Sequence, residues 1–233
     1  MKDGFLPNSR DVLKRAPQRR IGPTRLSVSG FFCFGSQGMI PYESTLERDL
    51  LRRLAYSPRV LQIDSQPVRI DWQDGKDHRR RYTPDYLIYW KSMGELWRVR
   101  DLPWLVEVKP AIELRRHWRK WHPKFRAASR YAHEQGWRFR IMDESRIRDV
   151  MFRNAVLLEQ CASVNYSVSL GELPPDFRAG SVRVASELAQ RFPCGHSEHG
   201  LSALWQLVAQ GHLDCDLTEP LGPNTELWIA NAS

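Results

Sequence analysis

The chain has 233 residues, of which 42% are hydrophobic and 27% are charged, a composition typical of a folded protein rather than a disordered one. This length suffices for one domain of ordinary size and a small second one. No apolar run approaches the roughly 18 residues that cross a bilayer, and the N-terminus lacks the apolar core of a secretory signal. We therefore expect a cytoplasmic protein without a membrane partner, whose four widely spaced cysteines are free thiols.

The net charge of +8 favours a polyanionic partner, although charge alone does not separate DNA from RNA or anionic lipid. Positive charge gathers in a proline-containing arm, residues 1–25, and in the acid-free segment 115–130, where aromatic residues interleave with it. A solvated helix face with its aromatics in the core explains the second segment equally well. The residues expected to hold DNA are Arg19, Arg20, Arg115, Arg116, Arg119, Lys120 and Lys124.

The first half of the chain is predicted to hold one helix and several strands. Leucines recur on one helical face over residues 43–56, and Ser57-Pro58 ends that helix. Residues 30–35 are expected to form a strand or a loop, and residues 59–72 a pair of strands broken at Pro67. After a turn at 73–79, another strand is expected over 80–90. Residues 96–109 are expected to form two strands separated by a turn.

Further along, residues 111–135 are predicted to form a long helix, with Pro123 as a candidate interruption and Gly136 closing its end. A strand follows over 137–142. A second helix begins with Asp143 as its N-cap and continues to about residue 162. This order predicts the α/β class, with a mixed sheet flanked by helices.

The C-terminal part is predicted to be a small separate module. Residues 163–180 contain Pro174-Pro175 and no strong periodicity, so they are interpreted as a linker. Amphipathic helices over 181–192 and 200–211, followed by two short strands over 212–230, describe a winged-helix-like module. The predicted domains are an arm (1–25), a catalytic domain (26–162), the linker (163–180) and this module (181–233).

The residues most informative about chemistry are Pro84-Asp85, placed in the middle of a strand, and Glu107-Val108-Lys109, at the end of another. Alternate strand residues share a face, so Glu107 and Lys109 point the same way while Val108 points into the core. If the two strands pair, Asp85 lies beside Glu107, and adjacent carboxylates favour Mg²⁺ or Mn²⁺. Lys109 then positions or deprotonates a water. A cross-strand salt bridge is the structural alternative.

Residues 27–160 resemble TnsA, the endonuclease subunit of heteromeric transposases. The matching blocks are PYESTLERDLL, PRVLQIDSQPVRI, RRYTPDYLI, WLVEVKP and KFRAASRYAHEQGWRFRIMDESRIR. The resemblance implies a restriction-endonuclease-like PD-(D/E)xK core with four catalytic residues, Glu47, Asp85, Glu107 and Lys109. It places Mg²⁺ (or Mn²⁺) on Glu47, Asp85, Glu107 and the Val108 carbonyl. Glu43, one turn before Glu47, is expected either as a helper or in a structural role, and Gln66 either near the metal or in a strand-end hydrogen bond.

The resemblance further implies a bacterial protein that cuts the 5′ strand of duplex DNA at element ends. Its expected partners are a TnsB-type DDE transposase and a TnsC-type AAA+ ATPase, and a CRISPR-associated transposon is one candidate for the element. Two alternatives stay open. One is a stand-alone PD-(D/E)xK repair or restriction nuclease, and the other is a non-enzymatic DNA-binding adaptor.

Overall fold

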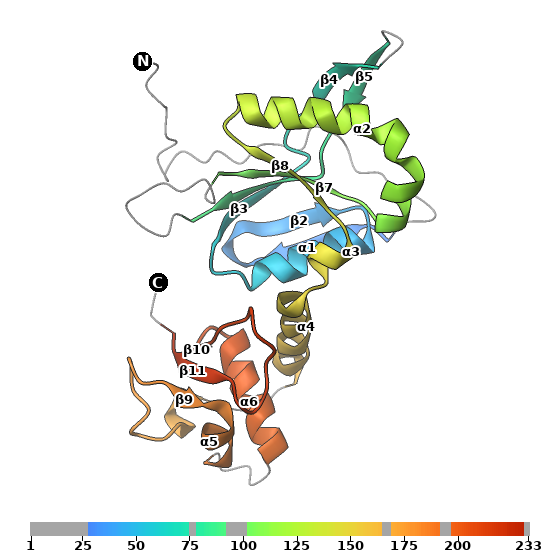
Figure 1. Ribbon diagram of the computed structural model, residues 1–233. Coiled ribbons are helices and arrows are strands. Elements are labelled where there is room, and N and C mark those ends of the chain that lie inside the picture. The colour runs from blue at the N-terminus through green and yellow to red at the C-terminus, as the bar shows by residue number, and fades with distance from the viewer. Residues whose placement is uncertain (1–27, 75–77, 92–101, 165–168, 192–196, 231–233) are drawn as a thin grey trace, which may run out of the picture. The chain divides into compact units, whose positions relative to one another are not determined.

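The computed structural model describes residues 28–74, 78–91, 102–164, 169–191 and 197–230 (Figure 1). The chain divides into two compact units, one made of the chain up to Arg48 together with Ser57–Glu144, the other of Asp49–Tyr56 together with the chain from Ser145. The predicted arm, with Arg19 and Arg20, lies outside the described residues. The predicted division into functional domains remains a prediction.

The first unit is built on a four-stranded sheet of order β3-β6-β7-β8. Its strands are β3 (Val60–Ser65), β6 (Tyr86–Trp90), β7 (Trp104–Val108) and β8 (Arg138–Met142). The pairs β3–β6 and β6–β7 are antiparallel, whereas β7–β8 is parallel. The crossover between the parallel strands is α2 (Ala111–Glu134), which lies across one face of the sheet in Figure 1. The predicted α/β class with a mixed sheet and flanking helices is confirmed.

Helix α2 packs on the sheet through a buried stripe. Phe125 and Ala128 belong to the same core cluster as Leu87 of β6 and Leu105 of β7. Pro123 lies inside the helix, which continues through it, and Figure 1 shows α2 bending part-way along. A proline lacks the N–H of a helical hydrogen bond and its ring crowds the preceding turn, so it bends a helix that packing holds together.

Residues 80–90 are not the single strand that was predicted. They form β5 (Arg79–Tyr82) and β6, and Asp85 directly precedes β6 instead of lying in the middle of a strand. β5 pairs with β4 (Ile70–Gln73) in a separate two-stranded ribbon, so the predicted pair over 59–72 also divides between two sheets. Pro67 and Pro84 stand at the two breaks, where a residue without an N–H interrupts the ladder.

Among the N-terminal elements of the described chain, the first strand and the helix were predicted, whereas the second strand was not. β1 (Gly30–Phe34) and β2 (Gly38–Tyr42) form an antiparallel hairpin. The helix predicted over 43–56 is α1 (Thr45–Ala55), and it buries the leucines that predicted it, Leu46, Leu50, Leu51 and Leu54.

Two predicted helices near and within the second unit are each divided. The helix predicted from Asp143 is α3 (Glu144–Ile147) followed by α4 (Val150–Ser163), because Asp149 caps α4 by accepting the Phe152 N–H. The helix predicted over 181–192 is a short strand, β9 (Arg183–Val184), followed by α5 (Ala185–Gln190). β9 is extended because it pairs with β11 (Glu226–Ile229), a partner distant in the sequence.

The second unit is completed by α6 (Ser197–Ala209) and β10 (Leu213–Asp214), and its sheet has the order β10-β11-β9. Its core includes Leu158, Leu188, Leu204, Leu213 and Leu227. Leu173 and Phe177, within the predicted linker, are buried in this same core. Across the described part of the chain, no helix has both the length and the apolar character that crossing a bilayer requires.

Candidate functional site

Asp85 and Glu107 lie side by side where β6 and β7 meet the end of the sheet. The register pairs Tyr86 with Val106, and one step further it sets Asp85 opposite Glu107. The backbone N–H of Asp85 donates to the Val106 carbonyl at 3.0 Å, and the N–H of Val108 donates to Oδ2 of Asp85 at 2.7 Å. Both the main chain and the carboxylate of Asp85 are therefore fixed by β7.

Lys109 bridges the two acids. Its Nζ lies 3.4 Å from Oε1 of Glu107 and 3.7 Å from Oδ2 of Asp85, and it donates to the Val108 carbonyl at 2.9 Å. Burial by itself lowers the pKa of Lys109, but the nearby carboxylates, Asp85 and Glu107 first, outweigh burial and raise that pKa above its ordinary value. The Lys109 side chain is thus a firmly held ammonium.

Glu107 has two further partners. Its side chain is 2% exposed, and its Oε2 accepts a 2.6 Å hydrogen bond from the Tyr82 hydroxyl. Oε1 accepts a 3.0 Å hydrogen bond from Lys124 Nζ, which comes from α2. Burial, followed by the charge of Glu107, raises the pKa of the Tyr82 hydroxyl, so this phenol stays a donor.

Unlike the other α2 residues predicted to hold DNA, Lys124 lies inside the site. Its Nζ lies 4.6 Å from the centroid of the Tyr82 ring, 4.9 Å from that of Phe125 and 5.1 Å from that of Trp121. The helical periodicity of the sequence could have indicated this position of Lys124. On α2, residue 124 lies beside the buried stripe that contains Phe125 and Ala128. Four other predicted DNA-binding residues are exposed on α2, namely Arg115, Arg116, Arg119 and Lys120.

Glu47 lies near this group without a direct hydrogen bond to it. Its carboxylate accepts from the Glu43 N–H at 2.8 Å and from the Ser44 hydroxyl at 2.9 Å, while the Glu47 N–H donates to Ser44 Oγ at 3.2 Å. This reciprocal pattern caps the start of α1 in the manner of a capping box. The Tyr86 hydroxyl donates to Oε2 of Glu47 at 3.4 Å.

Charge nevertheless couples Glu47 to the site. The pKa of Asp85 is raised well above its usual range, first by burial, then by the charges of Glu107 and Glu47, despite the opposing effect of Lys109. Burial also raises the pKa of Glu47. Glu107 and Glu47 are thus both close enough to Asp85 to destabilise its charged form.

Gln66 and Glu43 border the site from the β3 side. The Gln66 N–H donates to the Asp85 carbonyl at 2.7 Å, and its side-chain Nε2 donates to Oε1 of Glu43 at 3.3 Å. Gln66 has φ 46°, a left-handed conformation that non-glycine residues rarely adopt. Its Oε1 is buried and has no hydrogen-bond partner among the described residues, which leaves a free amide oxygen next to the acids.

The oxygen-rich composition of the site suits a hard divalent cation. Within the described residues, no three acidic, histidine or cysteine side chains already form a metal-binding group. The donors present are carboxylate, carbonyl and amide oxygens, the ligands that Mg²⁺ prefers. Burial first, and then the neighbouring carboxylates, raise the pKa of Asp85, and a cation beside it would favour its charged form. An ion held by Asp85 and Glu107 would replace ammonium contacts that these acids now make with Lys109 and Lys124.

One comparison with known proteins bears on this site. Residues 57–144 match a family model described as TnsA-like endonuclease N terminal. The matched segment contains Gln66, Asp85, Glu107 and Lys109, but it begins after Glu47. A search of curated proteins gave no match to the chain.

Proposed function

From the match of residues 57–144 to the TnsA-like endonuclease N-terminal family, we propose that the protein cuts the 5′, non-transferred strand of duplex DNA at the ends of a transposon. The observation that supports a nucleolytic role is the meeting of Asp85, Glu107 and Lys109 at one end of the sheet, where Lys109 Nζ lies 3.7 Å from Asp85 and 3.4 Å from Glu107. The proposed core is of the restriction-endonuclease-like PD-(D/E)xK type.

In this proposal, Asp85, Glu107 and the Val108 carbonyl hold Mg²⁺, for which Mn²⁺ substitutes, and Glu47 adds an oxygen. The ion would stabilise negative charge on the phosphate and acidify the attacking water. Lys109 orients that water, since its ammonium is already fixed between the carboxylates. The Val108 N–H keeps Asp85 in place. In-line attack on the phosphodiester leaves a 5′-phosphate and a 3′-hydroxyl.

Tyr82 and Lys124 act on the same carboxylate without touching the reacting atoms. Each occupies one oxygen of Glu107. A buried carboxylate that keeps two hydrogen bonds has little freedom to rotate, so its position is fixed before the substrate arrives. The exposed basic face of α2 is proposed to hold DNA phosphates, which gives affinity without sequence preference.

The C-terminal module is proposed to contact a protein. From residue 163 to the end, the chain has three arginines, no lysine and eight acidic residues, in contrast to its net charge of +8 overall. The residues of α6, the counterpart of a recognition helix in a winged-helix arrangement, include no lysine or arginine. DNA-reading surfaces are basic. This acidic module therefore suits a TnsC-type ATPase, while a TnsB-type transposase would supply the choice of DNA site.

The decisive experiment is strand-specific cleavage of a labelled transposon-end duplex with Mg²⁺ and the cognate TnsB-type and TnsC-type proteins. Wild-type protein should cut the 5′ strand, and Asp85→Ala should leave it intact while binding DNA as before. Glu134→Ala, which removes an exposed acid at the end of α2, should cut normally.

The same assay separates the alternatives. Cutting by the wild-type chain in the absence of both partners identifies a stand-alone nuclease. An intact 5′ strand alongside normal 3′ cuts identifies a non-enzymatic adaptor.

A further inference from the structure

We propose that the ribbon formed by β4 and β5 is a second DNA-binding element, which holds the phosphate backbone of the duplex beside the cleavage site. The inference rests on the proposed function for the identity of the ligand. It assigns a role to Arg79, Arg81 and Arg130, which lie outside the carboxylate cluster.

The ribbon has one face toward the core and one toward solvent. Its register pairs Ile70 with Tyr82, and both of these side chains are buried. Alternation places Asp71 with Arg81, and Gln73 with Arg79, on the opposite face. The core-facing pair anchors the ribbon, so the arginines are presented from a fixed support.

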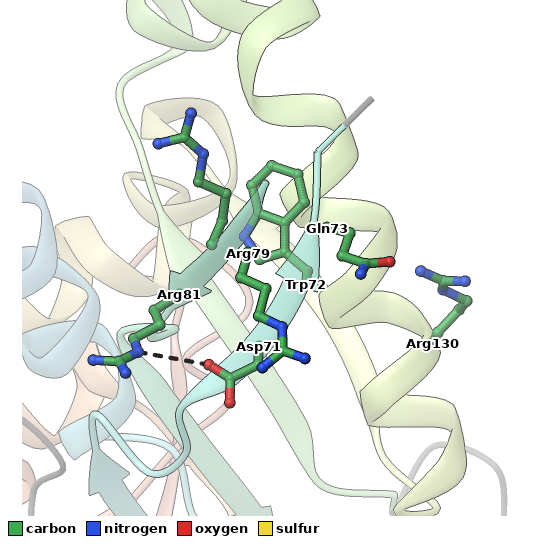
Figure 2. Close-up of a pocket in the computed structure, with 7 residues that line it drawn as sticks. Asp71, Trp72, Gln73, Arg79, Arg81 and Arg130 are labelled. Atoms are coloured by element: carbon green, nitrogen blue, oxygen red, sulfur yellow. Dashed lines mark ion pairs between the residues drawn. The ribbon is translucent and has the colours of Figure 1, made fainter. Parts of the chain in front are cut away.

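An open groove of about 880 Å³ lies between this ribbon and α2, as Figure 2 shows. Arg130 projects from α2 and lines the groove together with Arg79, Arg80 and Arg81, and Asp71 is the one acid among the lining residues that the structure describes. Among these residues positive charge predominates, which suits the negative charge of a phosphate backbone.

Several of these arginines are available to a ligand. Arg79 and Arg130 are exposed, and within the described part of the chain neither forms an ion pair. Arg81 lies 3.8 Å from Asp71, with both side chains more than 70% exposed (74% and 71%), so this pair is weak and easily exchanged. Arg80 is already held by Asp74 at 3.1 Å. A planar guanidinium group can donate two parallel hydrogen bonds to two oxygens of one phosphate.

The ribbon is directly continuous with the proposed active site. Tyr82, the last residue of β5, donates to Glu107 at 2.6 Å. Strands rise about 3.4 Å per residue, so Arg79 lies about 10 Å along the strand from Tyr82. Successive phosphates of one DNA strand advance about 3.4 Å along the helix axis. The arginines therefore reach phosphates a few nucleotides from the one that meets Asp85 and Glu107.

The test is the binding of a labelled duplex to the full chain, followed by fluorescence anisotropy over a range of salt concentrations with Ca²⁺ in place of Mg²⁺. For Arg79→Ala/Arg81→Ala, affinity should fall, and the slope of log affinity against log salt should decrease by about 1 for each phosphate that the protein no longer neutralises. Arg130→Ala should lower the slope by a similar step. Arg79→Lys/Arg81→Lys keeps the charge and should retain most of the slope.

Two controls separate a DNA contact from a structural effect. Asp71→Asn removes the acid of the groove and frees Arg81, so it should strengthen binding, whereas a change that damages the ribbon should weaken it. Arg183→Ala removes an exposed arginine of the second unit that is paired with Asp176, and it should leave the slope unchanged.

Equal affinity and slope for wild type and Arg79→Ala/Arg81→Ala would overturn the inference, and this is also the result expected if the ribbon contacts an acidic protein instead. Failure of this inference can be distinguished from failure of the proposed function. If the slope falls but no 5′ cut occurs, the ribbon holds and the nuclease role fails. If wild type cuts the 5′ strand and the arginine variants bind DNA as tightly as wild type does, the nuclease role holds and the inference about the ribbon fails.

Discussion

Lys124 Nζ lies 3.0 Å from Oε1 of Glu107, so a side chain from α2 neutralises an acid at the end of β7. An ammonium in this position competes with a divalent ion for the same oxygen. In Lys124→Met, we expect half-maximal cleavage at a lower Mg²⁺ concentration, by about fivefold if the competing ammonium contributes about 1 kcal/mol. Maximal rate should fall, because Glu107 is less firmly positioned.

The matched control for this prediction is Lys120→Met, one turn earlier on α2 and exposed. Its Mg²⁺ dependence should equal that of the wild type. A higher Mg²⁺ requirement in Lys124→Met would mean that Lys124 assists the ion rather than competing with it.

The Tyr82 hydroxyl is the second donor to Glu107, at 2.6 Å. Tyr82→Phe keeps the ring in the core but leaves a buried carboxylate oxygen without its partner. Hydrogen bonds to charged groups contribute about 1.5–3 kcal/mol, so single-turnover cleavage should slow by about tenfold or more. Tyr131→Phe, another partly buried tyrosine of this core cluster, serves as the control. An unchanged cleavage rate in Tyr82→Phe would show that Glu107 needs no fixing by the phenol.

The parts of the fold that were predictable from sequence are those set by local patterns. The leucine spacing of α1 and the buried run ending at Lys109 depend on residues close in the sequence, and both were predicted. The division of residues 80–90 was missed because each half pairs with a different strand, and no local pattern specifies distant partners. β9 was missed for the same reason, since its partner β11 lies about 40 residues further on.

The contacts within the site were also predictable only where they follow from strand patterns. Strand alternation and pairing predicted the meeting of Asp85, Glu107 and Lys109. The packing of Lys124 against Glu107 depends on how α2 crosses the sheet, which the sequence alone does not specify. The hydrogen bonds of Glu47 at the start of α1 were not predicted, although Ser44-x-x-Glu47 is a capping-box pattern that indicates them.

Asp149 links the N-terminus of α4 to Arg53 and should make the stability of the second unit depend on pH. It accepts the Phe152 N–H and pairs with Arg53 at 2.7 Å. Burial raises the pKa of Asp149, but the Arg53 and Phe152 hydrogen bonds outweigh it and lower the pKa overall. The stabilisation is therefore present above the unfolded pKa, about 3.9, and is lost as pH falls through the lower folded value.

We expect Asp149→Ala to lower the free energy of unfolding at pH 7 by about 1–2 kcal/mol, because a cap and a partly exposed ion pair are removed together. Asp149→Asn keeps a capping side chain and should be destabilised less. Thermal unfolding followed by circular dichroism from pH 7 down to about pH 3 measures both, and the difference from wild type should shrink below about pH 4. Asp176→Ala, which removes an acid that is more than half exposed and forms surface ion pairs, should change stability by less than Asp149→Ala. A constant difference across this pH range would exclude the charge of Asp149 as the cause.

Gly200 marks a close approach of α6 to α5. A Cβ at this position would lie 2.5 Å from the Ala189 carbonyl oxygen and 3.0 Å from its carbonyl carbon, and backbone atoms cannot rotate away as a side chain can. In an exposed helix, alanine in place of glycine raises the free energy of unfolding by about 1 kcal/mol. At position 200 the clash with the α5 backbone outweighs this gain. Gly200→Ala should lower stability by about 1–3 kcal/mol, the usual cost of overpacking. Gly222→Ala, whose Cβ would meet nothing within 4 Å, should unfold at the wild-type temperature. Equal unfolding temperatures for the two variants would mean that α5 and α6 separate at little cost, and that the core of the second unit does not depend on their contact.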